Sequence, residues 1–144
     1  MKKTILLLSL ASLLLLGACG VQSTADVGAG GGSQQTEQAK VTKLTAEQAH
    51  ERMQSGAPIV VLDVRTEDEY AQIHIPGAIL LPNEQIGSVP PEVLPVLDTE
   101  ILVYCRSGNR SANAAAKLLA MGYSKIFDFG GINDWEYEKE SGEY

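Results

Sequence analysis

The residues Cys105-Arg106-Ser107-Gly108-Asn109-Arg110 separate two segments of different pattern. The apolar residues 101–104 before them predict a buried strand, and residues 111–121 after them predict a helix. A thiol at a strand-to-helix junction lies where backbone N–H groups and the positive end of a helix converge. The loop is therefore expected to bind an anion. The two arginines add to this field, so Cys105 is expected to react as a thiolate.

The first 18 residues have the pattern of a bacterial export signal. A basic start, Lys2-Lys3, precedes an apolar run over residues 4–16 that is too short to span a membrane comfortably. The run ends in Leu16-Gly17-Ala18-Cys19, which looks like a lipobox. We expect residues 1–18 to be removed and Cys19 to be lipidated, which would anchor the chain on the extracytoplasmic side of a bacterial membrane. The alternatives are an ordinary signal peptide, cut before the cysteine, and a buried structural cysteine.

The chain has two cysteines. With Cys19 lipidated, the exported domain keeps Cys105 alone and cannot form an internal disulfide. An unpaired thiol outside the cytoplasm calls for an explanation. Because its neighbours are arginine, serine, glycine and asparagine, a reactive role for Cys105 is favoured over that of a buried apolar filler.

The charge of the chain is acidic. Its 11 Lys and Arg stand against 18 Asp and Glu. Removal of residues 1–18 would take away two lysines and no acid, leaving 9 against 18, a net charge of −9. An acidic chain without a basic run argues against nucleic-acid binding and against electrostatic docking on anionic lipid. Any membrane attachment is expected to come from the lipid anchor alone.

The stretch 19–40 is expected to be a lipidated cysteine followed by a flexible tether. It is rich in Gly, Ser, Gln, Thr and Ala, and such a chain has a root-mean-square reach of roughly 25 Å. A glycine-rich phosphate cradle is the alternative, but no strand precedes the glycines and no Gly-Lys-Ser/Thr ends them. Residues 41–144 are predicted to form one domain with a single core.

The sequence predicts alternating strands and helices in this domain. Residues 41–44 are expected to form a strand and Thr45 to cap a helix that Gly56 ends. The continuous apolar run 59–62 is typical of a strand covered on both faces in a parallel sheet. Asp63 and Arg65 stand at its carboxyl end, on the edge where Cys105 is expected. We interpret them as a supporting, scaffolding ion pair.

The remaining elements follow from turn signals and periodicity. Thr66 is expected to cap a short helix. Residues 78–81 and 125–129 are expected to be strands, and 83–98 a short helix with an irregular connection. Gly130-Gly131 is expected to open a last short helix that Trp135 anchors. After the cysteine loop, one helical face is expected to pack on the sheet through Ala112, Ala115, Ala116 and Leu119, with Gly122 ending the helix.

The two histidines are expected to be structural. His50 lies on the apolar stripe of the first helix, which favours a position at the rim of the core over a catalytic base. His74 lies in a Pro-Gly turn without a visible orienting group, which favours a turn residue over a Cys-His pair. With few carboxylates at ligand spacing, the sequence predicts no metal and no cofactor.

Several separate motifs together resemble the rhodanese homology domain, in order and over nearly all of residues 41–135. They are Asp63-Val64-Arg65, Glu69-Tyr70, His74-Ile75-Pro76-Gly77-Ala78, Cys105 to Arg110, and Gly130-Gly131 with Trp135. The resemblance implies an α/β domain with helices flanking a central five-stranded parallel sheet of strand order 1-5-4-2-3. It also implies that Cys105 carries sulfur and that the backbone N–H groups of residues 106–110 hold the anion, with Arg106 and Arg110 lining the pocket.

The activity that this resemblance implies is sulfur transfer through a Cys105 persulfide. The donor would be a small sulfur-containing anion such as thiosulfate or a persulfide, and the acceptor cyanide, a thiol or a protein. A single domain departs from the double-domain members of the family, so the pocket is expected to be open.

Two other functions are compatible with the sequence. A phosphatase or arsenate reductase would also use a cysteine in an N–H cradle, but phosphatases of this kind have five residues between Cys and Arg. Here four residues separate Cys105 from Arg110, which favours sulfur transfer. A non-catalytic persulfide carrier or binding module would need the same cysteine and stays open.

Overall fold

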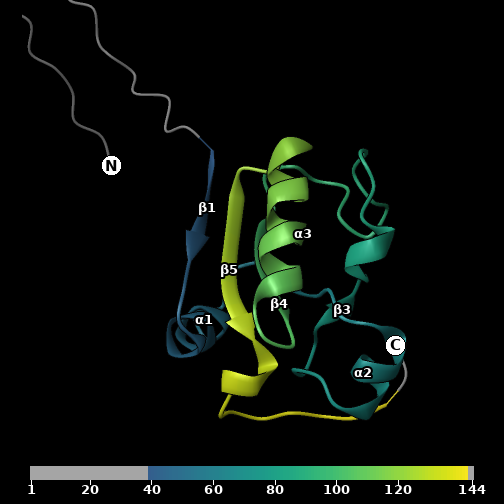
Figure 1. Cartoon of the computed structure of the whole chain (residues 1–144). Helices are drawn as coiled ribbons and strands as arrows, with labels where there is room; N and C mark the ends of the chain where they lie inside the picture. Colours follow the sequence, from purple (N-terminus) through teal and green to yellow (C-terminus); the bar gives the residue numbers. More distant parts are fainter. Residues whose placement is uncertain (1–38, 143–144) are drawn as a thin grey trace, which may run out of the picture. The chain divides into compact units, whose positions relative to one another are not determined.

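Five parallel strands form the centre of the computed structural model, which describes residues 39–142. The expected position of lipidation, Cys19, lies outside the described residues. The strands are β1 (Lys40–Lys43), β2 (Ile59–Asp63), β3 (Ile79–Leu80), β4 (Glu100–Cys105) and β5 (Lys125–Gly131). Their order across the sheet is β1-β5-β4-β2-β3, and each pair is parallel (Figure 1). The predicted α/β fold and strand order are confirmed.

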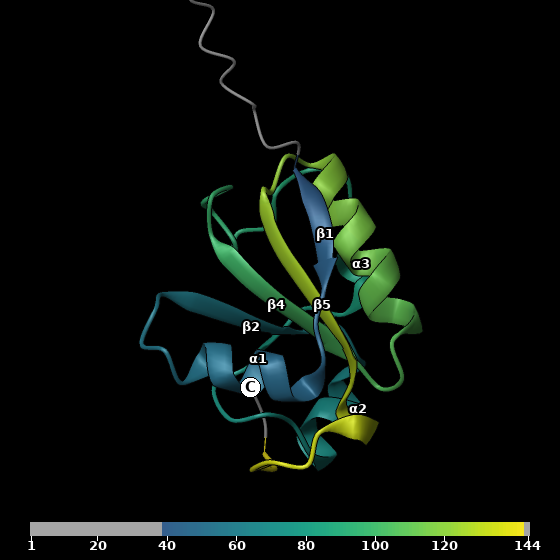
Figure 2. The same ribbon diagram turned by 90° about the vertical axis from the view of Figure 1, so that its left-hand side faces the viewer.

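Helices cover both faces of this sheet. They are α1 (Ala46–Met53), α2 (Glu67–Gln72) and α3 (Asn109–Ala120), with two 3-10 turns, η1 (Asn83–Gln85) and η2 (Ile132–Asp134). Figure 2 shows α1 and α3 on opposite sides of the strands. Thr45 and Thr66 cap α1 and α2 through complete capping boxes, as the sequence predicts. In the described part of the chain, no helix is long and apolar enough to cross a membrane.

The alternation of side chains along β4 decides which face carries the thiol. Ile101, Val103 and Cys105 belong to the core cluster that α3 covers. Leu102 and Tyr104 belong to the cluster on the other face, with Trp135 and the α2 residue Tyr70. Because successive side chains of a strand point to opposite faces, Cys105 lies on the α3 side of the sheet.

Two expectations about α3 are corrected. The helix begins at Asn109 instead of Ser111, so the last two loop residues form its first turn. Its buried face is not the predicted set Ala112, Ala115, Ala116 and Leu119, because Ala112 and Ala116 are exposed. The buried residues are Ser111, Ala114, Ala115 and Leu118. The physical reason is that Ser111 turns inward to donate a hydrogen bond to the buried Asp128.

Other boundaries also differ from the expectation. The strand expected at residues 78–81 is reduced to Ile79–Leu80, and the short helix after residue 83 is a single 3-10 turn. Gly130 and Gly131 are the final residues of β5, and Gly131 is also the N-cap of η2, so the pair opens the last short helix as expected, which is a single 3-10 turn. The glycines extend the strand towards the cysteine loop, and η2 begins only after them, followed by the buried Trp135.

Candidate active site

Cys105 is the last residue of β4 and lies at the carboxyl edge of the sheet. The pairing of β4 with β5 shifts register between Val103 and Cys105, the kind of irregularity that re-aims a side chain next to a site. The backbone N–H of Gly108 donates to the Cys105 Sγ at 3.1 Å. Gly108 is the N-cap of α3 with a φ of 99°, a left-handed conformation that glycine adopts without steric cost. The sulfur therefore lies at the positive end of a 12-residue helix.

The surroundings of the thiol favour its ionised form. Burial raises the pKa of Cys105, because it penalises the charged thiolate. Hydrogen bonds from the backbone N–H groups of Ser111, Ser107 and Gly108, and from the Ser111 hydroxyl, oppose this effect. Together they outweigh it, and the pKa of the Cys105 thiol lies below its ordinary value. An anion on this sulfur is stabilised mainly by backbone dipoles.

The end of β5 and the turn η2 pack against the backbone of the cysteine loop. A Cβ atom at Gly131 would lie 2.4 Å from the carbonyl oxygen of Arg106 and 2.7 Å from the Cα of Ser107. The backbone N–H of Asn133 donates to the same Arg106 oxygen at 3.3 Å. Only glycine allows such a close approach, so the position of the cysteine loop depends on residue 131.

A buried network fixes the first turn of α3 on the sheet. Ser111 and Asp128 are fully buried, and the hydroxyl of Ser111 donates to Oδ1 of Asp128 at 2.8 Å. The same oxygen accepts the backbone N–H of Gly130 at 2.9 Å, and Lys43 of β1 forms an ion pair with Asp128. The network joins β1, β5 and α3 directly beside the thiol.

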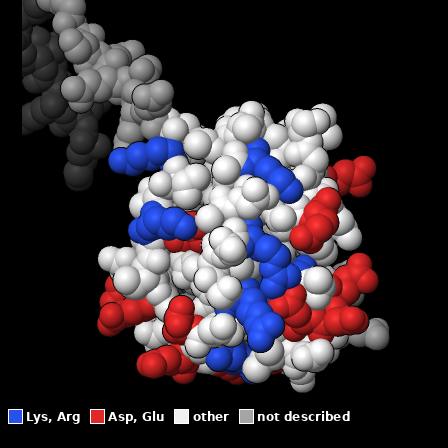
Figure 3. Space-filling model, viewed as in Figure 1, with Lys and Arg blue, Asp and Glu red and all other residues white. Residues whose placement is uncertain are grey.

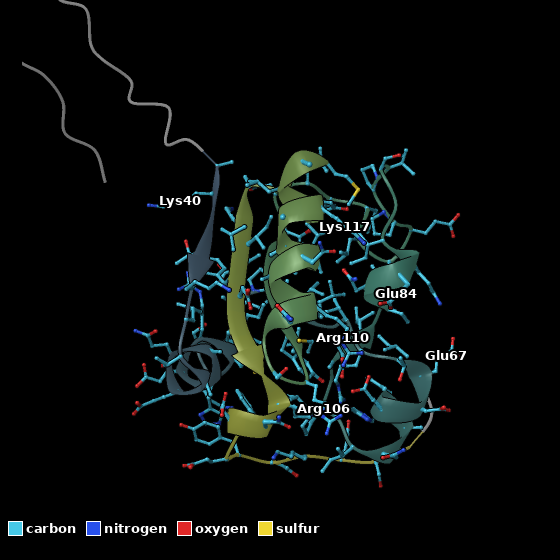
Figure 4. All side chains as sticks on the ribbon, in the orientation of Figure 1. Lys40, Glu67, Glu84, Arg106, Arg110 and Lys117 are labelled. Carbon is cyan, nitrogen blue, oxygen red and sulfur yellow. The ribbon has the colours of Figure 1, made fainter. Side chains whose placement is uncertain are left out.

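The charged residues of the loop lie in different surroundings. Ser107 and Asn109 are exposed, as is Arg106, whose side chain has no hydrogen-bond or ion-pair partner among residues 39–142. Arg110 is instead bound by Glu69 of α2, with Nη1 to Oε2 at 2.6 Å and Nη2 to Oε1 at 2.8 Å. Figure 4 shows Arg106 and Arg110 on the same side of the molecule, at the lower end of α3.

Asp63 and Arg65 form a buried ion pair at the end of β2. Their side chains are 0% and 3% exposed, and Nη2 of Arg65 lies 2.6 Å from Oδ2 of Asp63. Arg65 also donates from Nη2 to the carbonyl oxygen of Ile73 at 2.6 Å. Burial lowers the pKa of Arg65, but the Asp63 carboxylate outweighs this effect and the net pKa is raised. The pair ties β2 to the end of α2 and has the geometry of a scaffold.

Neither histidine lies in the cysteine loop. Nδ1 of His74 is 2.9 Å from the carbonyl oxygen of Tyr70, and Nε2 is 3.2 Å from a Glu140 carboxylate oxygen. His50 stacks on Tyr137 with ring centroids 3.7 Å apart. Among the residues that the structure describes, no group of three or more His, Cys, Asp and Glu side chains could hold a metal ion.

Sequence reasoning missed three residues that shape this site, Glu69, Ser111 and Asp128. The signal for Asp128 was present, because it is an acidic residue among the apolar residues 126–129, near the carboxyl end of a strand. Ser111 was assigned only to the helix, and Glu69 only to a helix cap and to a motif of the family resemblance, with no role at the site. Their contacts are long-range, since 17 and 41 residues separate Ser111 and Glu69 from their partners.

Comparison with known proteins fits this geometry. Residues 45–138 match the family model described as a rhodanese-like domain, which covers more than half of the chain. The chain belongs to the rhodanese-like domain family. The matched residues of this rhodanese-like domain include the whole cysteine loop, the Asp63–Arg65 pair and the strand β5 below the loop.

Solved structures of the family resemble the same part of the chain. A rhodanese with anions from E. coli is 31% identical, covers 58% of this chain and 98% of its own, and has a TM-score of 0.52. A thiosulfate sulfurtransferase from Pseudomonas aeruginosa is 28% identical with a TM-score of 0.63, over 72% of this chain and 21% of its own. A rhodanese-like domain protein from Staphylococcus aureus is 28% identical with a TM-score of 0.60, over 69% of this chain and 97% of its own.

Proposed function

We propose that this rhodanese-like domain is a sulfurtransferase that carries sulfane sulfur on Cys105. The observation that supports this most directly is the Sγ of Cys105, which accepts the Gly108 N–H at the start of α3 and has a lowered pKa. A thiolate is the nucleophile in such chemistry, and the same N–H groups can stabilise a persulfide anion.

The reaction has two steps. The Cys105 thiolate attacks the outer sulfur of thiosulfate, the S–S bond of the donor breaks, and its electron pair leaves on sulfite. The products are the Cys105 persulfide anion and sulfite, so the total charge is unchanged. In the second step, cyanide or a thiol takes the outer sulfur and the thiolate returns. Two half-reactions that share one covalent intermediate lead to ping-pong kinetics.

The length of the loop supports sulfur chemistry over phosphate chemistry. Four residues separate Cys105 from Arg110, and Asn109 and Arg110 already belong to the first turn of α3. The described cradle is short, and the guanidinium of Arg110 is bound by Glu69. A tetrahedral phosphoryl group has three oxygens to be bound and so needs more hydrogen-bond donors than the single terminal sulfur of a persulfide.

We also propose that the domain acts outside the cytoplasm, on a membrane to which Cys19 is attached by lipid. The support is the lipobox-like pattern before Cys19 and the Gly- and Ser-rich residues that follow it. An acidic domain on such a tether would be held near the lipid surface by its anchor and not by charge.

The test is to load the purified chain with thiosulfate after reduction, map the adduct by mass spectrometry and measure thiocyanate formation with cyanide. A gain of about 32 Da, one sulfur atom, on the Cys105 peptide with turnover is expected. The variant Cys105→Ala should give neither. A stable persulfide without turnover would indicate a carrier, and cysteine-dependent cleavage of an aryl phosphate without any sulfur adduct would contradict the proposal.

A further inference from the structure

Arg110, the last residue of the cysteine loop, is already engaged by a carboxylate. Both of its terminal nitrogens contact Glu69, at 2.6 Å and 2.8 Å, in the paired geometry with which arginine also binds anionic ligands. The side chains are about one quarter exposed, 28% for Arg110 and 26% for Glu69. A bound anion would therefore have to share Arg110 with Glu69 or displace it.

Glu69 is held in place independently of Arg110. Its Oε2 accepts the backbone N–H and the hydroxyl of Thr66, both at 3.2 Å, in the capping box of α2. Hydrogen bonding to Arg110 is the main reason that the pKa of Glu69 is lowered, to about 2. Glu69 therefore remains ionised throughout the neutral pH range, and its negative charge is a fixed part of the site.

The charge balance around Arg110 is set mainly by this carboxylate. The hydrogen bond to Glu69 is the largest cause of the raised pKa of Arg110, and the charges of Cys105 and Glu84 are smaller causes. In Figure 3 the lysines and arginines form a row down the face over α3, with acidic side chains beside it. Figure 4 shows that Lys117, Arg110 and Arg106 follow one another along this row, with Glu84 and Glu67 to its right.

Two further cations, Arg65 and Lys117, also have polar partners. Arg65 is paired with Asp63, and Lys117 donates to the carbonyl oxygen of Asn83 at 2.7 Å. Among the described residues of the loop and α3, Arg106 is the cation without a polar partner. The loop thus has one unpaired positive charge, on Arg106, and a second positive charge, on Arg110, that is paired with the negative charge of Glu69.

We propose that Glu69 determines which sulfur donor the site accepts. Because Glu69 occupies the guanidinium of Arg110, that guanidinium is not available to a bound anion. Dianions such as thiosulfate are therefore disfavoured relative to donors that are neutral or singly charged, such as the persulfide of a small thiol. The inference rests on the proposed function. The energy between a fixed charge and a ligand is proportional to the charge of the ligand, so the repulsion by Glu69 acts about twice as strongly on a dianion as on a monoanion.

The favoured loading step is balanced without a further reactant. The Cys105 thiolate attacks the outer sulfur of a protonated persulfide R–S–SH, and a new S–S bond forms. The donor S–S bond breaks, and its electron pair leaves on the thiolate R–S⁻. The Cys105 persulfide keeps the proton, and the charge is −1 on each side.

The decisive variant is Glu69→Gln, because it removes the charge and keeps the helix cap. In this same chain Gln48 has the corresponding position in the capping box of α1 and accepts the Thr45 N–H at 2.9 Å. The matched control is Glu67→Gln, which removes one charge from the same helical turn. The side chain of Glu67 is exposed and has no ion-pair or hydrogen-bond partner among residues 39–142.

The first measurement needs no turnover. The rate of alkylation of Cys105 by anionic iodoacetate is divided by the rate with neutral iodoacetamide, with the Cys105 peptide followed by mass spectrometry. We expect Glu69→Gln to raise this ratio by about threefold to tenfold and Glu67→Gln to leave it nearly unchanged. A ratio that falls or stays constant in Glu69→Gln would overturn the proposal, because Glu69 would then orient Arg110 for the anion.

The second measurement is made first on the unaltered chain, where it does not depend on how a variant folds, and then on Glu69→Gln. Loading of Cys105 is compared for thiosulfate, a dianion, and the persulfide of 2-mercaptoethanol. We expect faster loading by the persulfide and, in Glu69→Gln, a lower KM for thiosulfate with little change in kcat. Preference of the unaltered chain for thiosulfate would contradict the proposal. If neither donor loads Cys105, the sulfurtransferase function fails, but the alkylation ratio still decides the role of Glu69.

Discussion

The hydroxyl of Ser111 has one proton and several acceptors around it. Oγ lies 2.8 Å from Oδ1 of Asp128, 3.0 Å from the Gly108 carbonyl oxygen and 3.2 Å from that of Gly130. It is also among the groups that lower the pKa of Cys105. Because one proton serves one acceptor at a time, the thiolate competes with Asp128 for it. Ser111 thus couples the buried network to the reactive sulfur.

We predict that Ser111→Ala makes Cys105 less reactive at neutral pH. In the unaltered chain, the midpoint of the alkylation rate against pH should lie below the ordinary thiol pKa of about 8.5. Loss of the hydroxyl should move the midpoint to higher pH and slow iodoacetamide at pH 7 by up to about tenfold, the equivalent of one hydrogen bond. Ser107→Ala is the control, since Ser107 is exposed and acts on Cys105 through its backbone N–H. Equal midpoints for both variants would contradict this role.

Gly131 is required for steric reasons alone. Its φ of −134° is open to any residue, but a Cβ atom would lie 2.4 Å from the Arg106 oxygen. Gly131→Ala should displace the loop, reduce the free energy of unfolding by about 1–3 kcal/mol and change the alkylation rate of Cys105. Gly87→Ala is the matched control, because no atom lies within 4 Å of a Cβ there. Urea denaturation of both variants checks the prediction, which fails if they are equally stable.

At the scale of elements, the buried ion pair of Asp63 and Arg65 connects the end of β2 to the end of α2. Asp63→Ala would leave the guanidinium of Arg65 buried with the Ile73 carbonyl as its remaining acceptor. We expect a loss of about 3–5 kcal/mol in the free energy of unfolding, because an unpaired buried charge is strongly destabilising. Asp98→Ala removes the partner of Lys125 in an exposed pair and should cause no measurable change. Similar urea midpoints for the two variants would rule out a scaffolding role.

The element that carries the chemistry is α3, and its start could not be located from the sequence alone. The loop residues Asn109 and Arg110 have no apolar periodicity, so the predicted helix began at Ser111. The structure places both in the first helical turn, because the left-handed Gly108 ends the loop. The buried face differs from the predicted one by one position, from Ala112 to Ser111, which corresponds to about 100° of rotation about the helix axis. Periodicity predicted the helix but not its orientation.

At the scale of the whole molecule, the proposed lipid anchor leads to a prediction about both cysteines. Labelling of growing cells with palmitate should label the unaltered chain and Cys105→Ser. Cys19→Ser should take up no label and accumulate as the longer precursor, because the thiol of residue 19 is the proposed point of attachment. Labelled Cys19→Ser protein would contradict residue 19 as the point of attachment, and an unaltered mature chain that begins at Cys19 without lipid would show that the segment is an ordinary signal peptide.

Several features of the fold and of the candidate site could be predicted from local sequence. The continuous apolar runs predicted buried parallel strands, the Thr-x-x-Gln and Thr-x-x-Glu patterns predicted two capping boxes, and the strand–loop–helix pattern around Cys105 predicted a thiol in an N–H cradle. These features rest on contacts between residues close in the chain, so their pattern can be interpreted without knowledge of the fold. The resemblance of the motifs to rhodanese domains then supplied the strand order.

Only the tertiary structure decided which charges reach the site. Arg110 is expected from the sequence to line the pocket, but its guanidinium is paired with Glu69, 41 residues earlier. The close approach of Gly131 to Arg106 and the bond from Ser111 to Asp128 likewise join separate elements. Such contacts depend on how strands and helices pack, and a single sequence carries no local signal for them. The charge that a substrate meets at Cys105 is therefore a property of the fold.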